Sequence, residues 1–256
     1  MKNLFSIEGK TALVTGGSSG IGAMIARGYV ENGANVYIAS RKKDVCEQVA
    51  GELSKIGRCT AIAADLSAEA ECNRLADEIA EREGRLDILV NNAGANWGED
   101  IETFPDAAWD KVLGLNVKAI FHLTRRLIPT LEKAGTHEDP ARVINIGSID
   151  GIKPPLLETY AYSASKAAVH HMTRVLARKL APRHIAVNAV APGPFQSKMM
   201  RATLEQFGDS IAETNPLGRI GQDEDMAGIA IFLASRASAY MTGTVIPVDG
   251  GISTTS

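Results

Sequence analysis

Short apolar segments alternate with amphipathic helical segments along the whole chain, and this alternation limits the folds open to it. In the first unit, the apolar stretch 11–15 leads through a run of glycines into a helical pattern at 21–32. Strands that are apolar throughout and are joined by helices form a parallel sheet covered by helices on both faces. Because such crossovers are right-handed, the pattern predicts an α/β fold with a doubly wound parallel sheet. The expected strands are 11–15, 36–40, 59–65, 86–94, 142–148, 184–193 and 244–250, and the expected helices are 21–32, 45–55, 69–82, 106–131, 161–180 and 223–235.

Length and composition favour one folded domain over residues 1–256. The 256-residue chain is 45% hydrophobic and 22% charged, a mixture typical of a globular domain with a large core. Its net charge of -3 offers no attraction to nucleic acid or anionic lipid, and no run approaches the roughly 18 apolar residues of a membrane span. The cysteines form no C-x-x-C pair and the histidines no zinc-binding pattern, so we expect reduced thiols and no metal site. The sequence thus predicts a soluble, cytoplasmic protein without nucleic-acid or membrane partners.

A glycine-rich run stands between the first strand and the first helix. In a doubly wound sheet, ligands bind at the carboxyl ends of the strands, and glycines there let the backbone approach a pyrophosphate at a helix N-terminus. Glycine also serves ordinary tight turns, but the position between strand and helix favours a dinucleotide site. The expected cofactor-binding residues of this run are Gly16, Ser18, Ser19, Gly20, Ile21 and Gly22.

The segment after the second strand indicates which dinucleotide binds. Ser40, Arg41 and Lys42 stand there, and no acidic residue occurs between the start of this strand and Asp44. A carboxylate at this place would accept hydrogen bonds from a ribose hydroxyl, whereas two cations and a hydroxyl suit a 2′-phosphate. Unless these residues are only a solvated loop, NADPH is favoured over NADH.

The stretch YSASK places Tyr162 four residues before Lys166. Residues at this spacing share one face of a helix. A cation beside a phenol lowers the pKa of the phenol, so we expect Tyr162 to be a general acid. Taken alone, the pair could also be a chance feature of a helix surface.

Six motifs in order resemble those of the short-chain dehydrogenase/reductase family over essentially the whole chain. They are TGGSSGIG from Thr15, NNAG from Asn91, Asn116 in LNV, Ser148 in INIGS, YSASK, and APG from Ala191. The resemblance implies a single Rossmann-type domain with a seven-stranded parallel sheet, assembled as a homotetramer. It also implies that the catalytic residues are Asn116, Ser148, Tyr162 and Lys166.

In this resemblance each catalytic residue has a role in carbonyl reduction. Tyr162 would protonate the substrate oxygen, and Ser148 would hold that oxygen by a hydrogen bond where negative charge develops. Lys166 would act on Tyr162 through its charge and donate to the nicotinamide ribose. Asn116 is expected to hold a water that links Lys166 to solvent.

The resemblance also extends the cofactor site along the sheet edge. Two departures from the family are that Ser197 replaces the usual threonine and that Ser19 stands where many NADPH-binding members carry a basic residue. Phosphate recognition would therefore depend on Arg41 and Lys42. The further cofactor-binding residues are expected to be Asp65 and Leu66 near the adenine, Asn92, Ala93 and Gly94 near its ribose, Tyr162 and Lys166, and Pro192, Gly193, Phe195 and Ser197 near the nicotinamide.

Within the family, the chain most resembles bacterial 3-oxoacyl reductases of the type associated with rhamnolipid synthesis. The shared features are DPAR from Asp139, NWG from Asn96 and AYMTG from Ala239. A ketone or acyl-thioester substrate is therefore expected under a flap at residues 195–217. Arg183 could dock an acyl carrier protein, but the acidic pair Glu138 and Asp139 argues against an anionic partner. The apolar residues expected around the substrate are Trp97, Ile152, Leu156 and Leu157 in the walls and Met199, Met200, Leu204 and Phe207 in the flap.

Other functions remain open at this point. A dehydrogenase that oxidises a sugar, polyol or steroid alcohol would use the same residues. A nucleotide-sensing module without chemistry would not need Ser148, Tyr162 and Lys166. A serine hydrolase is excluded, because Ser148 stands in no G-x-S-x-G elbow and no histidine is placed as its base.

Overall fold

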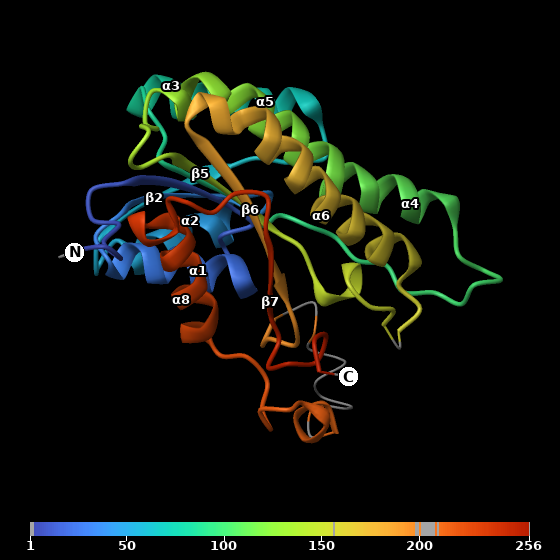
Figure 1. Ribbon diagram of the computed structural model, residues 1–256. Coiled ribbons are helices and arrows are strands. Elements are labelled where there is room, and N and C mark those ends of the chain that lie inside the picture. The colour runs from blue at the N-terminus through green and yellow to red at the C-terminus, as the bar shows by residue number, and fades with distance from the viewer. Residues whose placement is uncertain (1–2, 156, 198–199, 201–207, 209, 256) are drawn as a thin grey trace.

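A parallel sheet lies between two layers of helices (Figure 1). The computed structural model describes residues 3–155, 157–197, 200, 208 and 210–255. The sheet has seven strands in the order β3-β2-β1-β4-β5-β6-β7, so the strand order reverses between β1 and β4. The strands are β1 (Thr11–Thr15), β2 (Asn35–Ser40), β3 (Arg58–Ala63), β4 (Ile88–Asn91), β5 (Ala141–Ile146), β6 (Ile185–Pro192) and β7 (Val245–Val248).

The two faces of the sheet bury two separate cores. Along β1, Ala12 and Val14 pack on one side and Leu13 on the other, as the alternation of side chains in a strand requires. The first core is covered by α1 (Gly20–Glu31), α2 (Lys43–Leu53) and α8 (Asp223–Ala234). The second is covered by α3 (Glu69–Glu83), α5 (Ala119–Glu132) and α6 (Tyr160–Leu180). The predicted doubly wound α/β fold is thereby confirmed.

One predicted helix differs from the observed structure. The expected single helix 106–131 is divided into α4 (Asp106–Leu113), a π-helical segment η1 (Gly114–Lys118) and α5. π-Helical segments interrupt α-helices mostly at functional sites. This segment contains Asn116, whose side chain is buried and bonded outside the helix, and such tertiary bonds leave no local signal in the sequence.

Neither a membrane span nor a metal cluster is found in the part of the chain that the structure describes. No helix there is long and apolar enough to cross a bilayer. No group of three or more histidine, cysteine, aspartate or glutamate side chains there could hold a metal ion.

Candidate active site

The glycine run after β1 forms a turn that leaves no space for side chains. Gly16 has a φ of 65°, in the left-handed region that favours glycine. A Cβ atom on Gly22 would lie 2.3 Å from the Gly16 carbonyl oxygen and 2.4 Å from Asn92 Nδ2. The Asn92 amide donates to the Thr15 carbonyl at 2.9 Å, while the Thr15 hydroxyl accepts from the N–H groups of Asn92 and Ala93. The ends of β1 and β4 are thus tied together where the strand order reverses. Thr15 was not among the predicted site residues, although it begins the motif TGGSSGIG.

The N-terminus of α1 follows this turn and fits a pyrophosphate. Ser19 is the N-cap residue but makes no side-chain hydrogen bond to the first turn, so its side chain leaves the first N–H groups available. A Cβ atom on Gly20 would lie 3.1 Å from the Cβ of Ser197, which brings the start of the predicted flap to the same place. A cradle of glycines before helix N–H groups suits an anion. The predicted residues that form it are Gly16, Ser18, Ser19, Gly20, Ile21 and Gly22.

Ser40, Arg41 and Lys42 lie at the end of β2, beside the glycine turn. The Gly16 N–H donates to the Ala39 carbonyl at 2.7 Å, which holds these two segments together. Arg41 and Lys42 are exposed, and the ion pairs among the described residues include the neighbouring Lys43 but neither of these two. Two unpaired cations at this edge fit the 2′-phosphate of NADPH.

Helix α6 carries Tyr162 and Lys166 on one face, as the spacing predicts. Lys166 Nζ lies 5.3 Å from the centroid of the Tyr162 ring and donates to the Ile146 carbonyl at 2.8 Å. Ser148 stands two residues after the end of β5, is 7% exposed, and lies close enough to Tyr162 to lower the pKa of its phenol. The structure therefore brings Ser148, Tyr162 and Lys166 together at the carboxyl end of β5.

Burial shifts both ionisable groups toward their neutral forms. It raises the pKa of Tyr162 to about 12, although the hydrogen bond with Ser148 acts in the opposite direction. Burial also lowers the pKa of Lys166 to about 8. The expectation that Lys166 lowers the pKa of Tyr162 is therefore wrong for the protein without cofactor. Removing a phenolate from water is unfavourable, and this effect of burial exceeds the lowering that Ser148 produces.

Asn116 is held by protein groups on both sides of its amide. Its Oδ1 accepts from the Ala95 N–H at 2.8 Å, and its Nδ2 donates to the Ala95 carbonyl at 3.0 Å and to the Ser165 hydroxyl at 2.9 Å. Ser165 is fully buried and donates in turn to the Tyr162 carbonyl at 2.6 Å. Asn116 and Ser165 thus connect the loop after β4 to the helix that carries Tyr162. Both amide hydrogens of Asn116 are used, so a water held by this residue would donate to one of its oxygens. Ser165 was missed as a site residue, although it stands inside YSASK.

The other predicted cofactor residues lie along the same edge of the sheet, with different degrees of access. Asp65 follows β3, and its carboxylate accepts from the Ser67 N–H at 3.1 Å. The Leu66 side chain belongs to the second core and is 5% exposed, so only the backbone of Leu66 could face an adenine. The residues directly after β4 are Asn92, Ala93 and Gly94.

At the nicotinamide end, Pro192 ends β6 and the Gly193 N–H donates to the Val248 carbonyl at 3.0 Å. The Phe195 ring is 2% exposed and packs on Gly221, where a Cβ atom would lie 2.3 Å from the ring. Its side chain therefore braces this segment, which leaves its backbone to meet a cofactor. The Ser197 hydroxyl accepts from the Met200 N–H at 3.2 Å.

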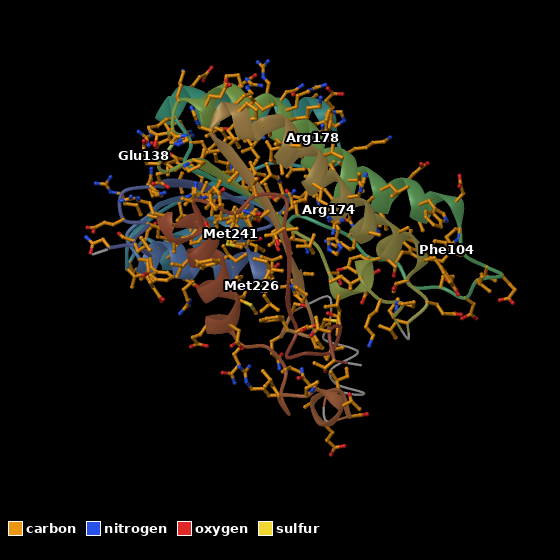
Figure 2. The ribbon with its side chains drawn as sticks, in the orientation of Figure 1. Phe104, Glu138, Arg174, Arg178, Met226 and Met241 are labelled. Carbon is orange, nitrogen blue, oxygen red and sulfur yellow. The ribbon has the colours of Figure 1, made fainter. Side chains whose placement is uncertain are left out.

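Two loops border the site on the substrate side. The Glu99 N–H donates to the Glu158 carbonyl at 3.2 Å, which joins the loop after β4 to the loop before α6. Phe104 strengthens this junction through ring contacts with Trp109 at 6.0 Å and Tyr160 at 5.4 Å, near the ends of α4 and α6 in Figure 2.

The predicted apolar walls are present in part. Ile152 and Leu157 are 44% and 48% exposed, and Trp97 lies under Lys111, whose Nζ is 4.9 Å from the ring centroid. Leu156 and the flap residues Met199, Leu204 and Phe207 lie outside the described residues.

Charges near the proposed docking residue Arg183 are already paired. Arg183 forms an ion pair with Glu132. The Asp139 carboxylate accepts from Lys10 at 2.9 Å and from Arg142 at 2.9 Å. Two cations thus offset the charge of Asp139, so the predicted repulsion of an anionic partner depends on Glu138, which forms no ion pair among the described residues.

Comparison with known proteins agrees with this geometry. A family model described as enoyl-(acyl carrier protein) reductase matches residues 16–253. The chain is 50% identical to the rhamnolipids biosynthesis 3-oxoacyl-(acyl-carrier-protein) reductase of Pseudomonas aeruginosa, over 98% of this chain and 99% of the relative. It is 35% identical to the galactitol 2-dehydrogenase (L-tagatose-forming) of Cereibacter sphaeroides, over 98% of this chain and 97% of that protein.

Among solved structures, the Pseudomonas aeruginosa RhlG/NADP active-site complex matches with a TM-score of 0.95 and 49% identity, covering 99% of this chain and 100% of that one. The six motifs, the strand order and these whole-length similarities agree, and the chain belongs to the short-chain dehydrogenase/reductase family.

Proposed function

We propose that the protein is an NADPH-dependent oxidoreductase that reduces a ketone to a secondary alcohol. The observation that carries this proposal is the group formed by the buried Ser148 and Lys166 and the half-buried Tyr162 at the carboxyl end of β5, on the same sheet edge as the glycine cradle. A regulator that only binds nucleotide would have no use for a buried phenol and ammonium, which are unfavourable to bury. These groups therefore support catalysis over a nucleotide-sensing module.

The residues of the chain divide the work of the reduction. NADPH, when bound, supplies a hydride to the carbonyl carbon. The Ser148 hydroxyl holds the substrate oxygen, and the Tyr162 hydroxyl donates a proton to that oxygen as negative charge develops on it. A phenol with a raised pKa can still do this, because an alkoxide is a far stronger base than a phenolate. Lys166 holds positive charge beside Tyr162, and Asn116 and Ser165 fix the helix that carries both.

The preference for NADPH follows from the end of β2. Arg41 and Lys42 are exposed there and form no ion pair among the described residues. No carboxylate stands between the start of β2 and Asp44. The similarity to an NADP complex across the whole chain supports the same preference. We assign the glycine cradle to the pyrophosphate and Arg41 to the 2′-phosphate.

For the substrate, we propose a 3-oxoacyl thioester or another hydrophobic ketone. The relative from Pseudomonas aeruginosa is named a 3-oxoacyl-(acyl-carrier-protein) reductase, and the exposed Ile152 and Leu157 beside the site offer apolar surface for an acyl chain. An acyl carrier protein as partner is a narrower proposal. Arg183 forms an ion pair with Glu132 and would have to break it to bind a phosphate or carboxylate of the carrier protein.

A dehydrogenase of a polyol or sugar is the second candidate. It is favoured by the 35% identity to the galactitol 2-dehydrogenase, because the same catalytic residues serve the oxidative direction. We also propose a homotetramer in the cytoplasm. The three free cysteines among the described residues support a reducing compartment.

Initial rates of NADPH and NADH oxidation test the function directly. The substrates would be 3-oxoacyl thioesters of increasing chain length, aryl ketones and cyclic diketones, with galactitol and NADP+ or NAD+ for the reverse direction. We expect turnover of long 3-oxoacyl thioesters with NADPH. Tyr162→Phe should abolish turnover while the protein still binds NADPH. Activity restricted to oxidation of galactitol would overturn the ketoreductase proposal in favour of the polyol dehydrogenase.

A further inference from the structure

The turn after β5 lies directly against the middle of α6. A Cβ atom on Gly147 would lie 2.2 Å from His170 Nε2, and one on Gly151 would lie 2.6 Å from the carbonyl carbon of Lys166. These two glycines let the turn approach the helix where Lys166 and His170 stand. Asp150 is part of this turn, in the 3₁₀ segment η2 (Ile149–Gly151), and its N–H donates to the Ser148 hydroxyl at 3.1 Å. The turn therefore carries an aspartate two residues after Ser148 and packs against the stretch of α6 that contains Lys166.

Among the described residues, no acidic side chain lies at salt-bridge distance from Lys166. Its side chain is buried, and its Nζ is bonded to the neutral carbonyl of Ile146. Burial lowers the pKa of Lys166 to about 8, and the charge of Asp150 acts against this shift. Reciprocally, burial raises the pKa of the Asp150 carboxyl, and the charge of Lys166 acts against that shift. The two groups thus stabilise each other's charged forms through space.

The remaining titratable groups around the turn do not provide this negative charge. Burial lowers the pKa of His170 to about 4, so His170 is neutral at neutral pH. Tyr162 is protonated, since burial raises its pKa to about 12. Arg174 and Lys153 are cations, and Lys153 donates to the Ile252 carbonyl at 3.1 Å. Among the described residues, Asp150 is therefore the anion whose charge acts on Lys166.

We propose that Asp150 is a positioning residue whose carboxylate is the counter-charge of the Lys166 ammonium. This proposal deepens the proposed function, since it assigns Asp150 a role in the same reductase site. Asp150 would act on catalysis only through Lys166 and Tyr162, because it keeps the ammonium charged and the phenol protonated at the pH of the reaction.

Titration of Lys166 in the protein without cofactor or substrate tests this role. The Cε signals of ¹³C-labelled lysine would be followed by NMR against pH, with the Lys166 signal assigned by its loss in Lys166→Arg. We expect a midpoint near 8 in the wild type and a midpoint about one pH unit lower in Asp150→Asn. Asp150→Glu, which keeps the charge, should restore the midpoint, and Asp110→Asn on the exposed face of α4 should leave it unchanged. A folded Asp150→Asn protein with the wild-type midpoint would overturn the proposal.

A second measurement needs no substitution that removes the charge. The side-chain carboxyl signal of Asp150 in the wild type, assigned by comparison with Asp150→Glu, should show a second, smaller step when Lys166 loses its proton near pH 8. Absence of that step would refute the coupling even if Asp150→Asn did not fold. Because neither titration uses the enzyme reaction, both decide the role of Asp150 whether or not the ketoreductase assay succeeds.

Discussion

At the residue scale, Arg41 at the end of β2 and the pair Tyr162 and Lys166 on α6 have different electrostatic roles. Arg41 is exposed and unpaired, so it retains its full capacity to donate to an arriving phosphate. Tyr162 is half-buried and Lys166 is buried, and burial shifts the pKa values of both toward their neutral forms. Binding selectivity should therefore depend on Arg41, and proton transfer on the buried pair.

Arg41→Ala should weaken NADPH binding much more than NADH binding. A charge-assisted hydrogen bond contributes roughly 1.5–3 kcal/mol, so we expect the NADPH dissociation constant to rise about 10- to 100-fold. The NADH constant should change by less than about threefold, since NADH has no 2′-phosphate. Fluorescence titration of both cofactors measures the two constants. Lys43→Ala is the matched control, because Lys43 is the next cation but is paired with Glu47. An equal loss for both cofactors would refute the phosphate assignment.

At the element scale, small residues decide how closely helices and turns pack. A Cβ atom on Gly28 of α1 would lie 2.7 Å from the Cβ of Ala227 on α8, so the two helices touch at this glycine. Gly147 and Gly151 have the same role between the turn after β5 and His170 of α6. These contacts hold the elements that carry the glycine cradle and the catalytic helix.

Gly28→Ala should destabilise the protein although alanine favours helices. The added methyl group must separate α1 from α8, and overpacking of this kind lowers the free energy of unfolding by about 1–3 kcal/mol. Gly228→Ala is the control within α8, since nothing lies within 4 Å of its Cβ position. There we expect a gain of about 0.5–1 kcal/mol from helix propensity alone. Urea unfolding at neutral pH gives both values, and a change of the same sign in the two variants would contradict the packing argument.

His170 should make the protein sensitive to acid. Its pKa is about 4 in the folded protein, because of burial, and 6.5 in the unfolded chain, so the unfolded chain binds more protons between these values. The stability that neutral His170 contributes is complete above pH 6.5 and is lost as the pH falls toward 4, by up to about 3 kcal/mol. In urea unfolding between pH 7 and pH 4, His170→Gln should show a smaller loss than the wild type. His171→Gln, at the exposed neighbour, should behave like the wild type, and an identical pH dependence in all three proteins would exclude His170 as the cause.

At the scale of the whole molecule, the sequence predicted the layers, the strands and the family, because these depend on local periodicity and on motifs that are contiguous in the chain. The π-helical segment at Asn116 was not predictable, because it is stabilised by bonds to Ala95 and Ser165, which stand 21 and 49 positions away. The prediction that the pKa of Tyr162 is lowered was wrong for a similar reason. The spacing to Lys166 is visible in the sequence, whereas the depth of burial follows from the assembled fold.

Exposed apolar side chains on two helices bear on how copies of the chain could assemble. Most exposed large apolar side chains of the described residues lie in loops and turns, but Phe121 on α5 and Val175 on α6 are 42% and 47% exposed on helices of one layer. Because contiguous apolar patches mark interaction surfaces, these two side chains are the positions at which we test a contact between copies of the chain.

Under the proposed homotetramer, light scattering should give a mass four times that of one chain, and Val175→Lys should reduce that mass if α6 lies in the interface, because the new charge would be buried there. Ile56→Lys is the matched control, since Ile56 is 54% exposed in the turn after α2 and should tolerate the charge. A wild-type mass equal to one chain would exclude the tetramer. A tetramer that Val175→Lys leaves intact would place the interface on another face.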